Sequence, residues 1–153
     1  MFNFMHNMNS YEETMKNFTW KDAEEELGYR PGDFINIGEY CSDRICKLGF
    51  ADKKALIWQD HQGNERTFTF NDTRILSNSI AQYLRNLGVK SGERVCLFMD
   101  KVPELYLGFL GVLKLGAIVQ PLFSAFGPES LLTRLEDAET TAIITQKKHL
   151  PKV

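Results

Sequence analysis

The chain has 153 residues, of which 43% are hydrophobic, and its 18 Lys and Arg against 20 Asp and Glu give a formal net charge of −2. This composition is that of an ordinary globular protein, and a chain of this length can bury enough surface for one core. The near-neutral charge excludes the concentrated basic surface that phosphate neutralisation needs, so no nucleic-acid partner is expected.

The first predicted elements form an N-terminal arm, residues 1–33, that is separate from an α/β domain of residues 34–153. Two short helices are expected in the arm, around Tyr11–Phe18 and Lys21–Leu27, with Gly28 closing the second and a turn at Arg30–Asp33 after it. The first ten residues carry no Lys or Arg and no apolar run, which argues against a targeting signal and favours the cytoplasm.

A third helix is predicted from Ile37 to Leu48. Two strands follow, Ala55–Gln59 and Arg66–Phe70, joined by a turn around Gly63, and together they predict a β-hairpin. Beyond Phe70 the apolar spacing changes to the helical period. This predicts a helix that is capped by Asn71 or Asp72 and ends at Gly88. Its inward-facing residues, spaced by four, four and three, are expected to be Leu76, Ile80, Leu84 and Leu87.

The rest of the chain alternates strands and helices. The predicted order is strand Arg94–Met99, helix Pro103–Leu115, strand Ala117–Leu122, helix Pro128–Ala138 with Leu131, Leu132 and Leu135 inward, and strand Thr141–Thr145. Crossover helices between apolar strands imply a parallel sheet covered on both faces. The fold class is therefore α/β: a helical arm and a hairpin, followed by β-α-β-α-β parallel units.

The apolar stretch Leu105–Phe123 is 19 residues long, which approaches a membrane-spanning length. Lys114 near its middle and the helix-breaking Pro121 argue against insertion in a bilayer. We therefore expect a buried helix and strand, and no membrane partner. Within that helix Gly108 and Gly111 share a face, which allows close packing against a neighbouring element.

Metal chemistry has little support in the sequence. The cysteines, Cys41, Cys46 and Cys96, are odd in number and contain no C-x-x-C pair, and the histidines lie far apart. The thiols are expected to be buried as small apolar groups. The chain also lacks a G-x-x-x-x-G-K-[ST] loop, a G-x-G-x-x-G fingerprint, a G-x-S-x-G elbow and an H-E-x-x-H pair, so no catalytic residue and no metal ligand is assigned.

One loop has the position of a ligand site. In open α/β sheets ligands bind outside the carboxyl ends of the strands, and the segment Phe123–Pro128 leads from such a strand end to a helix N-terminus. Free N–H groups there suit an anion, and an exposed Phe can stack on a base. Glu129 in the first helical turn would oppose a phosphate.

Short strings distributed along nearly the whole chain carry a family resemblance. They are Tyr11–Thr14 (YEET), Phe18–Trp20 (FTW), Glu65–Phe70 (ERTFTF), Leu76–Asn78 (LSN), Leu84–Val89 (LRNLGV), Gly92–Val95 (GERV), Pro103–Tyr106 (PELY), Leu113–Ala117 (LKLGA), Pro121–Phe126 (PLFSAF) and Arg134–Asp137 (RLED). As an ordered set they resemble the start of an AMP-forming acyl-CoA synthetase, and most closely the acetyl-CoA synthetase family.

The resemblance implies an enzyme, an acetate–CoA ligase of the adenylate-forming superfamily, that uses ATP, Mg²⁺ and coenzyme A. It implies that residues 34–153 are part of a larger N-terminal AMP-binding domain and stop before its phosphate loop. Phe123, Ser124 and Ala125 match the stretch that lies along the adenine end of coenzyme A in the family. The acetate pocket, the hinge and the adenylation lysine follow the matched segment, so the 153 residues alone are expected to be inactive.

Other functions stay open on the residues. The chain fits a stand-alone binding or scaffold module, a subunit of a split acyl-CoA synthetase, or a small coenzyme A-binding domain. Propionate is an alternative to acetate, because the acid pocket lies outside the matched strings. An uncovered last strand would expose a sheet edge, so we also expect self-association through Thr141–Thr145.

Overall fold

The structure is a computed structural model that describes residues 10–153. The prediction of no targeting signal falls on residues that lie almost entirely outside this range. The described chain divides into two compact units, with the boundary after Ile35. The first unit contains helices α1 (Tyr11–Asn17) and α2 (Trp20–Leu27), and both helices were predicted from the sequence.

Both helices of the first unit begin at a side-chain cap. The Ser10 hydroxyl accepts a hydrogen bond from the backbone N–H of Glu13 at 3.3 Å. Thr19 and Asp22 cap α2 reciprocally, each side chain accepting from the other residue's backbone N–H. Gly28 then ends α2 with a φ of +65°, a conformation that suits glycine.

The second unit contains the hairpin, the sheet and the helices that cover it. Its elements are α3 (Ile37–Tyr40), α4 (Asp43–Ile45), the π-helical turn η1 (Cys46–Phe50), β1 (Lys54–Gln59), β2 (Glu65–Thr69), α5 (Phe70–Asn86), β3 (Arg94–Met99), α6 (Pro103–Leu115), β4 (Ile118–Phe123), α7 (Pro128–Asp137), β5 (Ala142–Thr145) and the 3₁₀ segment η2 (Lys147–Lys152).

The predicted helix Ile37–Leu48 is wrong as a single element, because the chain breaks at Ser42. The Ser42 backbone leaves the helical region, with φ −137° and ψ −66°. Its buried hydroxyl donates to the carbonyl of Gly38 at 2.7 Å. Serine competes with the helix for backbone hydrogen bonds in this way. Three short turns therefore replace one helix.

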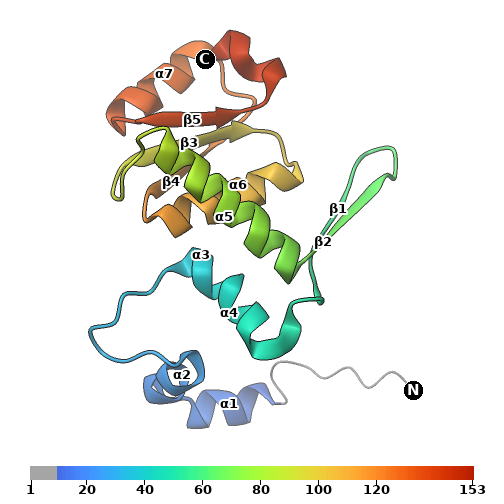
Figure 1. Ribbon diagram of the computed structural model, residues 1–153, viewed down its shortest axis with the longest axis vertical. Coiled ribbons are helices and arrows are strands. Elements are labelled where there is room, and N and C mark those ends of the chain that lie inside the picture. The colour runs from blue at the N-terminus through green and yellow to red at the C-terminus, as the bar shows by residue number, and fades with distance from the viewer. Residues whose placement is uncertain (1–9) are drawn as a thin grey trace. The chain divides into compact units, whose positions relative to one another are not determined.

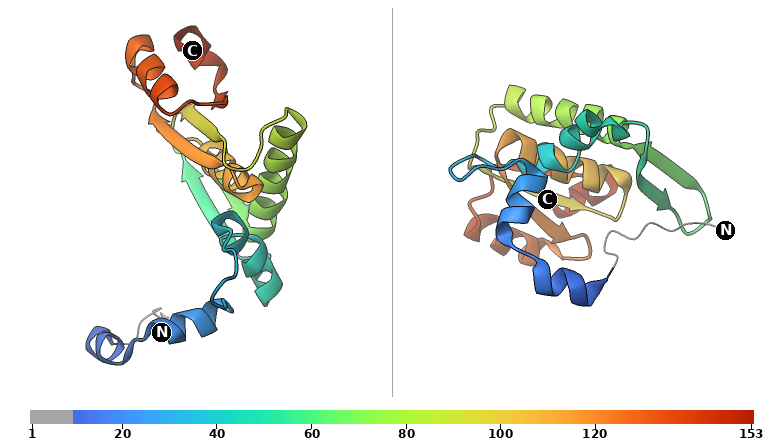
Figure 2. Two further views of the ribbon diagram at one scale, coloured as in Figure 1. Left: turned by 90° about the vertical axis from the view of Figure 1, so that its left-hand side faces the viewer. Right: turned by 90° about the horizontal axis from the view of Figure 1, so that it is seen from below.

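Strands β1 and β2 form the predicted antiparallel hairpin, which projects from the start of α5 (Figure 2). The Trp58 indole N–H donates to the carbonyl of Lys101 at 2.7 Å, and Arg66 pairs with Glu104 at 2.8 Å. These two contacts attach the hairpin to the start of α6.

The β-α-β-α-β prediction is confirmed by a parallel sheet with the strand order β4-β3-β5. Helices α5 and α6 lie on one face and α7 on the other (Figure 1). Alternate residues of β3 serve the two layers: Val95 and Leu97 pack toward α5 and α6, and Cys96 and Phe98 toward α7. All four side chains are fully buried, so β3 is the centre of the core.

Helix α5 is rotated from its predicted orientation. Its buried residues are Thr73, Ser77, Ala81 and Leu84, whereas the side chains of Leu76 and Leu87 are exposed. The small residues face α6 because that helix approaches closely: a Cβ on Gly111 would lie 2.7 Å from Ile80 Cγ2. The expected close-packing role of Gly111 is thereby confirmed.

The cap of α5 also differs from the prediction. Thr69 is the N-cap, and Asp72 is the third helical residue of a capping box rather than the cap itself. In α7, Leu131 is buried as predicted, but Leu132 is 55% exposed. The prediction that Leu132 faces inward is therefore wrong, and the buried face of α7 is narrower than its leucines indicate.

The expectation of three buried thiols is wrong for Cys41, which is exposed, and Cys46 is only half-buried. Cys96 is buried, and burial raises the pKa of its thiol to about 11. A thiol with that pKa stays protonated at neutral pH and acts as an apolar core group. Within residues 10–153, no helix combines the length and the apolar character needed to cross a bilayer.

Candidate functional site

The three strands of the sheet end side by side, and each is followed by a polar residue or a loop. Asp100 follows β3, Ser124 follows β4, and Gln146 follows β5. Since the strands are parallel and adjacent in the order β4-β3-β5, these residues gather at one edge. This carboxyl edge is the position where open α/β sheets bind ligands.

Asp100 is the centre of the polar contacts at this edge. Its carboxylate forms an ion pair with Lys148 and lies 2.9 Å from His149 Nε2, while its backbone N–H donates to Gln146 Oε1 at 2.8 Å. Hydrogen bonds from Lys148, Ser124 and His149, with the Lys148 bond the strongest, hold the pKa of Asp100 well below its usual range. Asp100 is therefore ionised at neutral pH, and its carboxylate anchors η2 to the sheet.

The loop after β4 presents an aromatic side chain to solvent. Phe123 is 65% exposed and contacts Phe126 edge to face, with ring centroids 5.9 Å apart. The Arg134 guanidinium lies over the Phe126 ring, 4.3 Å from its centroid. Phe123 thus has a supported position and a free surface that a planar group could cover.

The residues next to Phe123 are small and their backbone is fixed. The carbonyl of Ser124 accepts a hydrogen bond from Lys152 Nζ at 2.9 Å. Ala125 is exposed, so its backbone can be approached from solvent. The structure therefore brings the three residues singled out from the sequence, Phe123, Ser124 and Ala125, to the same edge as Asp100.

Helix α7 starts beside this loop, above a shallow hollow lined by Gly127, Pro128, Glu129 and Ser130. No side chain caps the helix, so its first N–H groups have no side-chain acceptor. Glu129 places a negative charge in the same turn, which disfavours an anion there. In residues 10–153, no three or more His, Cys, Asp or Glu side chains are placed to hold a metal ion.

Four residues of this edge were missed by sequence reasoning: Asp100, Lys148, His149 and Lys152. Asp100 carried a usable signal, because it directly follows a buried parallel strand, and the rule that selected Phe123 applies to every strand of the sheet. The residues of η2 carried none, since only the fold returns that segment to Asp100 and Ser124. The arrangement offers an exposed ring, an approachable backbone and paired charges, and the Asp100 carboxylate holds the Ser124 hydroxyl by a hydrogen bond.

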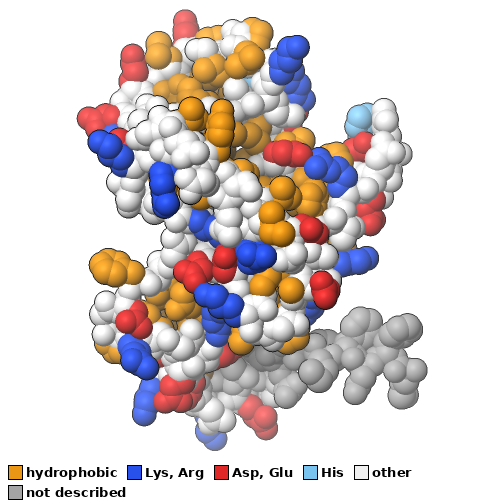
Figure 3. Space-filling view, viewed as in Figure 1, with side chains coloured by type: hydrophobic (Ala, Val, Ile, Leu, Met, Phe, Trp, Pro, Cys, Tyr) orange, Lys and Arg blue, Asp and Glu red, His pale blue; other side chains and the backbone are white. Residues whose placement is uncertain are grey.

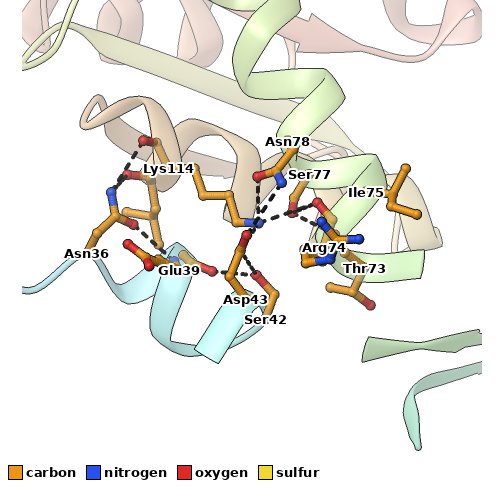
Figure 4. Close-up of polar contacts among 12 residues, drawn as sticks. Asn36, Glu39, Ser42, Asp43, Thr73, Arg74, Ile75, Ser77, Asn78 and Lys114 are labelled. Carbon is orange, nitrogen blue, oxygen red and sulfur yellow. Dashed lines mark hydrogen bonds and ion pairs between the residues drawn. The ribbon is translucent and has the colours of Figure 1, made fainter. Parts of the chain in front are cut away.

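A second polar cluster surrounds Lys114, on the side of α6 that faces α4 and α5 (Figure 4). Lys114 pairs with Asp43, and its ammonium donates to Asn78 Oδ1 at 2.9 Å. Burial raises the pKa of Asp43, but hydrogen bonds from Lys114 and Ser42 outweigh it and hold that pKa below its usual range. Every charge in this cluster has a partner, so it joins helices and leaves nothing to bind substrate.

Comparison with known proteins defines the class. The family model for AMP-binding enzymes matches residues 47–153, and the chain belongs to that family. The matched residues include all three strands of the parallel sheet and its carboxyl edge. The conclusion agrees with the fold expected from the sequence.

Individual relatives narrow the resemblance to acyl-CoA synthetases. The acetyl-coenzyme A synthetase of Bacillus subtilis is 35% identical over 97% of this chain and 26% of its own length. That of Gemmatimonas aurantiaca is 36% identical over 74% of this chain and 17% of its own. The crystal structure of Brucella canis acyl-CoA synthetase superposes with a TM-score of 0.83, at 28% identity, over 95% of this chain and 26% of its own. The chain thus spans between 17% and 26% of the length of these relatives.

Proposed function

We propose that these 153 residues are the N-terminal segment of an acetate–CoA ligase, which converts acetate, ATP and coenzyme A to acetyl-CoA, AMP and pyrophosphate. The observation that carries the proposal is the 35% identity with an acetyl-coenzyme A synthetase across 97% of the chain. Acetate is proposed over propionate because the relatives named above are acetyl-CoA synthetases. The cytoplasmic location stays a prediction.

The residues present do not fit ATP and Mg²⁺. A triphosphate needs a phosphate-binding loop and unpaired cations, and the sequence contains no such loop. At the carboxyl edge Lys148 is committed to Asp100, and Lys152 to the carbonyl of Ser124. We therefore expect no adenylation by the 153 residues alone, because nothing here stabilises the charge of a leaving pyrophosphate.

A pyrophosphate-release assay tests this expectation. The purified 153-residue chain is incubated with ATP, Mg²⁺, acetate and coenzyme A, beside an intact acetyl-coenzyme A synthetase as the positive control. The proposal expects release from the control and only the uncatalysed background from the chain. Acetate-dependent turnover by the chain would show that the segment holds a complete active site, and the assignment of its chemistry to later residues would be wrong.

Coenzyme A fits the carboxyl edge in part. Phe123 offers an exposed ring for the adenine, and Ser124 and Ala125 are small enough to let the ligand approach the backbone. Three cations near the ring are already engaged: Arg134 lies over Phe126, Lys148 pairs with Asp100, and Lys152 donates to the carbonyl of Ser124. We propose that this chain contributes the adenine end of the coenzyme A surface, with affinity in about the millimolar range.

Titration of the chain with coenzyme A, followed by chemical-shift changes, tests this surface. Phe123→Ala removes the stacking ring and is expected to weaken binding about fivefold or more, because stacking a base on an aromatic ring contributes about 1–3 kcal/mol. Ile118→Ala is the matched control, since Ile118 lies at the other end of β4 and is similarly exposed, at 53%. Equal affinities for the two variants would place the coenzyme elsewhere.

A further inference from the structure

The register of two neighbouring strands places Asp100 beside Ser124. In the parallel pair of β3 and β4, Met99 lies opposite Phe123. Asp100 and Ser124 are the next residues along the two strands, and side chains at paired positions point to the same face of a sheet. The Ser124 hydroxyl accordingly donates a hydrogen bond to the Asp100 carboxylate. This contact is made by the ends of two adjacent strands, so it is part of the sheet itself.

Ser124 also lies at the centre of a tight turn. The Phe126 N–H donates to the carbonyl of Phe123 at 3.0 Å, which closes a four-residue β-turn with Ser124 and Ala125 as its central residues. Neither central residue has a positive φ, so the turn is of a type that residues other than glycine adopt. The turn brings the rings of Phe123 and Phe126 edge to face, 5.9 Å apart. The orientation of the exposed Phe123 ring therefore depends on the conformation of this turn.

The carboxylate of Asp100 is engaged by protein groups rather than left open to a ligand. Its Oδ1 lies 2.9 Å from His149 Nε2, and its Oδ2 pairs with Lys148. Basic side chains are visible over η2, the segment that supplies Lys148 (Figure 3). The ion pair offsets a negative charge that would otherwise repel the phosphates of coenzyme A. The route from Asp100 to a ligand on Phe123 thus runs through Ser124.

A second contact holds the same turn from η2. The carbonyl of Ser124 accepts a hydrogen bond from Lys152 Nζ at 2.9 Å. Segment η2 is itself fixed to β3, since His149 is only 8% exposed and its ring lies 5.5 Å from that of Phe98. Asp100 therefore restrains Ser124 twice, directly through the hydroxyl and indirectly through the segment that carries Lys152.

We propose that Asp100 is a positioning residue for coenzyme A: by holding Ser124 at the centre of the turn, it keeps the Phe123 ring in the orientation that stacks on the adenine. The inference rests on the coenzyme A surface proposed above. A turn that is already ordered loses little conformational freedom when the ligand binds, whereas a loose turn must be ordered at that moment. The affinity for coenzyme A therefore depends on Asp100, although this carboxylate does not contact the coenzyme.

Two substitutions of Asp100 separate positioning from stability. Asp100→Ala removes the acceptor of the Ser124 hydroxyl, and we expect it to weaken coenzyme A binding about fivefold, as the loss of the ring does. Asp100→Asn loses the charge that pairs with Lys148 but keeps an acceptor oxygen for the hydroxyl, so its affinity should stay within about twofold of that of the unchanged chain. A residue that only stabilised the fold through its charge would affect binding equally in both variants.

The matched control is Thr145→Val. The Thr145 hydroxyl donates to the carbonyl of Phe98 at 2.6 Å, so this change also removes a hydrogen bond at the carboxyl edge, on the strand that does not carry the turn. We expect it to leave the affinity for coenzyme A within about twofold of the unchanged value. An equal loss of affinity in Thr145→Val and Asp100→Ala would show a general loosening of the edge and would overturn the proposal.

Combining Asp100→Ala with Phe123→Ala tests whether the ring carries the effect. If Asp100 acts by orienting Phe123, Asp100→Ala should weaken binding less than twofold in a chain that already lacks the ring, because the two changes remove the same interaction. A fivefold loss both with and without the ring would mean that Asp100 affects the coenzyme by another route.

The order of the turn in the free chain provides a readout that needs no ligand. Backbone ¹⁵N relaxation of the Ser124 and Ala125 amides should give order parameters of about 0.85 in the unchanged chain and in Asp100→Asn, and below about 0.6 in Asp100→Ala. If the unchanged chain does not bind coenzyme A, the proposed surface is refuted and this role of Asp100 with it. If it binds, and Asp100→Ala changes neither the affinity nor the order of the turn, the role of Asp100 alone is refuted.

Discussion

The buried Lys114–Asp43 pair gives the sharpest stability prediction. The Lys114 side chain is only 7% exposed and that of Asp43 20%. Lys114→Met keeps most of the volume but leaves the carboxylate with a hydrogen bond from Asn78 at 3.4 Å and with the Ser42 hydroxyl at 2.9 Å, whose single proton is shared with the carbonyl of Gly38. Removing one partner of a buried pair costs about 3–5 kcal/mol. Because the Asp43 side chain is 20% exposed and keeps the Asn78 donor, we expect the lower end, about 3 kcal/mol, or about a 100-fold fall in the folded to unfolded ratio.

Urea unfolding followed by far-ultraviolet circular dichroism measures this loss. Lys47→Met is the matched control, because Lys47 pairs with Glu39 at 3.0 Å while both side chains are mostly exposed, 71% and 51%. Exposed pairs contribute about 0–1 kcal/mol. Adding Asp43→Asn to Lys114→Met should cost less than the sum of the two single changes. If Lys114→Met destabilises no more than Lys47→Met, the reasoning about the buried pair is refuted.

Three further outcomes are expected from the same unfolding measurement. Gly111→Ala should cost about 1–3 kcal/mol, since its Cβ would lie 2.7 Å from Ile80, whereas Gly108→Ala, with its nearest contact at 3.4 Å, should be neutral or gain up to about 1 kcal/mol in helix propensity. Thr69→Ala removes the N-cap of α5 and should cost about 1 kcal/mol. The pKa of Asp100 is lowered in the folded state, so its carboxylate stabilises the fold fully at neutral pH. That stabilisation is lost as the pH falls below about 4. Asp100→Asn should therefore lower the free energy of unfolding more at pH 7 than at pH 3.

The order of the elements could be predicted because local signals mark their ends. Helix α6 begins at Pro103 and ends at Gly116, the positions where proline and glycine are expected in a helix. Gly116 adopts the left-handed conformation, with φ +80°. The buried face of α5 could not be predicted from leucine spacing. The close approach of α6 selects Ser77 and Ala81 for that contact, and that approach is a property of the fold rather than of the helix. Ser42 similarly breaks a helix through a hydrogen bond that a periodic pattern does not register.

Only the part of the candidate site that is formed by consecutive residues could be predicted from the sequence. Phe123–Ala125 could be found because the loop directly joins a strand end to a helix start. The contact of Lys152 with Ser124 joins residues 28 positions apart, and that of His149 with Asp100 joins residues 49 apart. No spacing within the sequence reports such pairs, since they depend on the strand order β4-β3-β5 and on η2 returning to the carboxyl edge after β5.

The most direct test of the account is a chimera that joins residues 1–153 to the remaining part of the Bacillus subtilis acetyl-coenzyme A synthetase. The measurement is acetate-dependent pyrophosphate release, followed by acetyl-CoA formation. If this chain is the N-terminal segment of an acetate–CoA ligase, the chimera regains both activities, while the 153 residues alone have neither. A folded, monodisperse chimera that releases no pyrophosphate with acetate would contradict the proposed function.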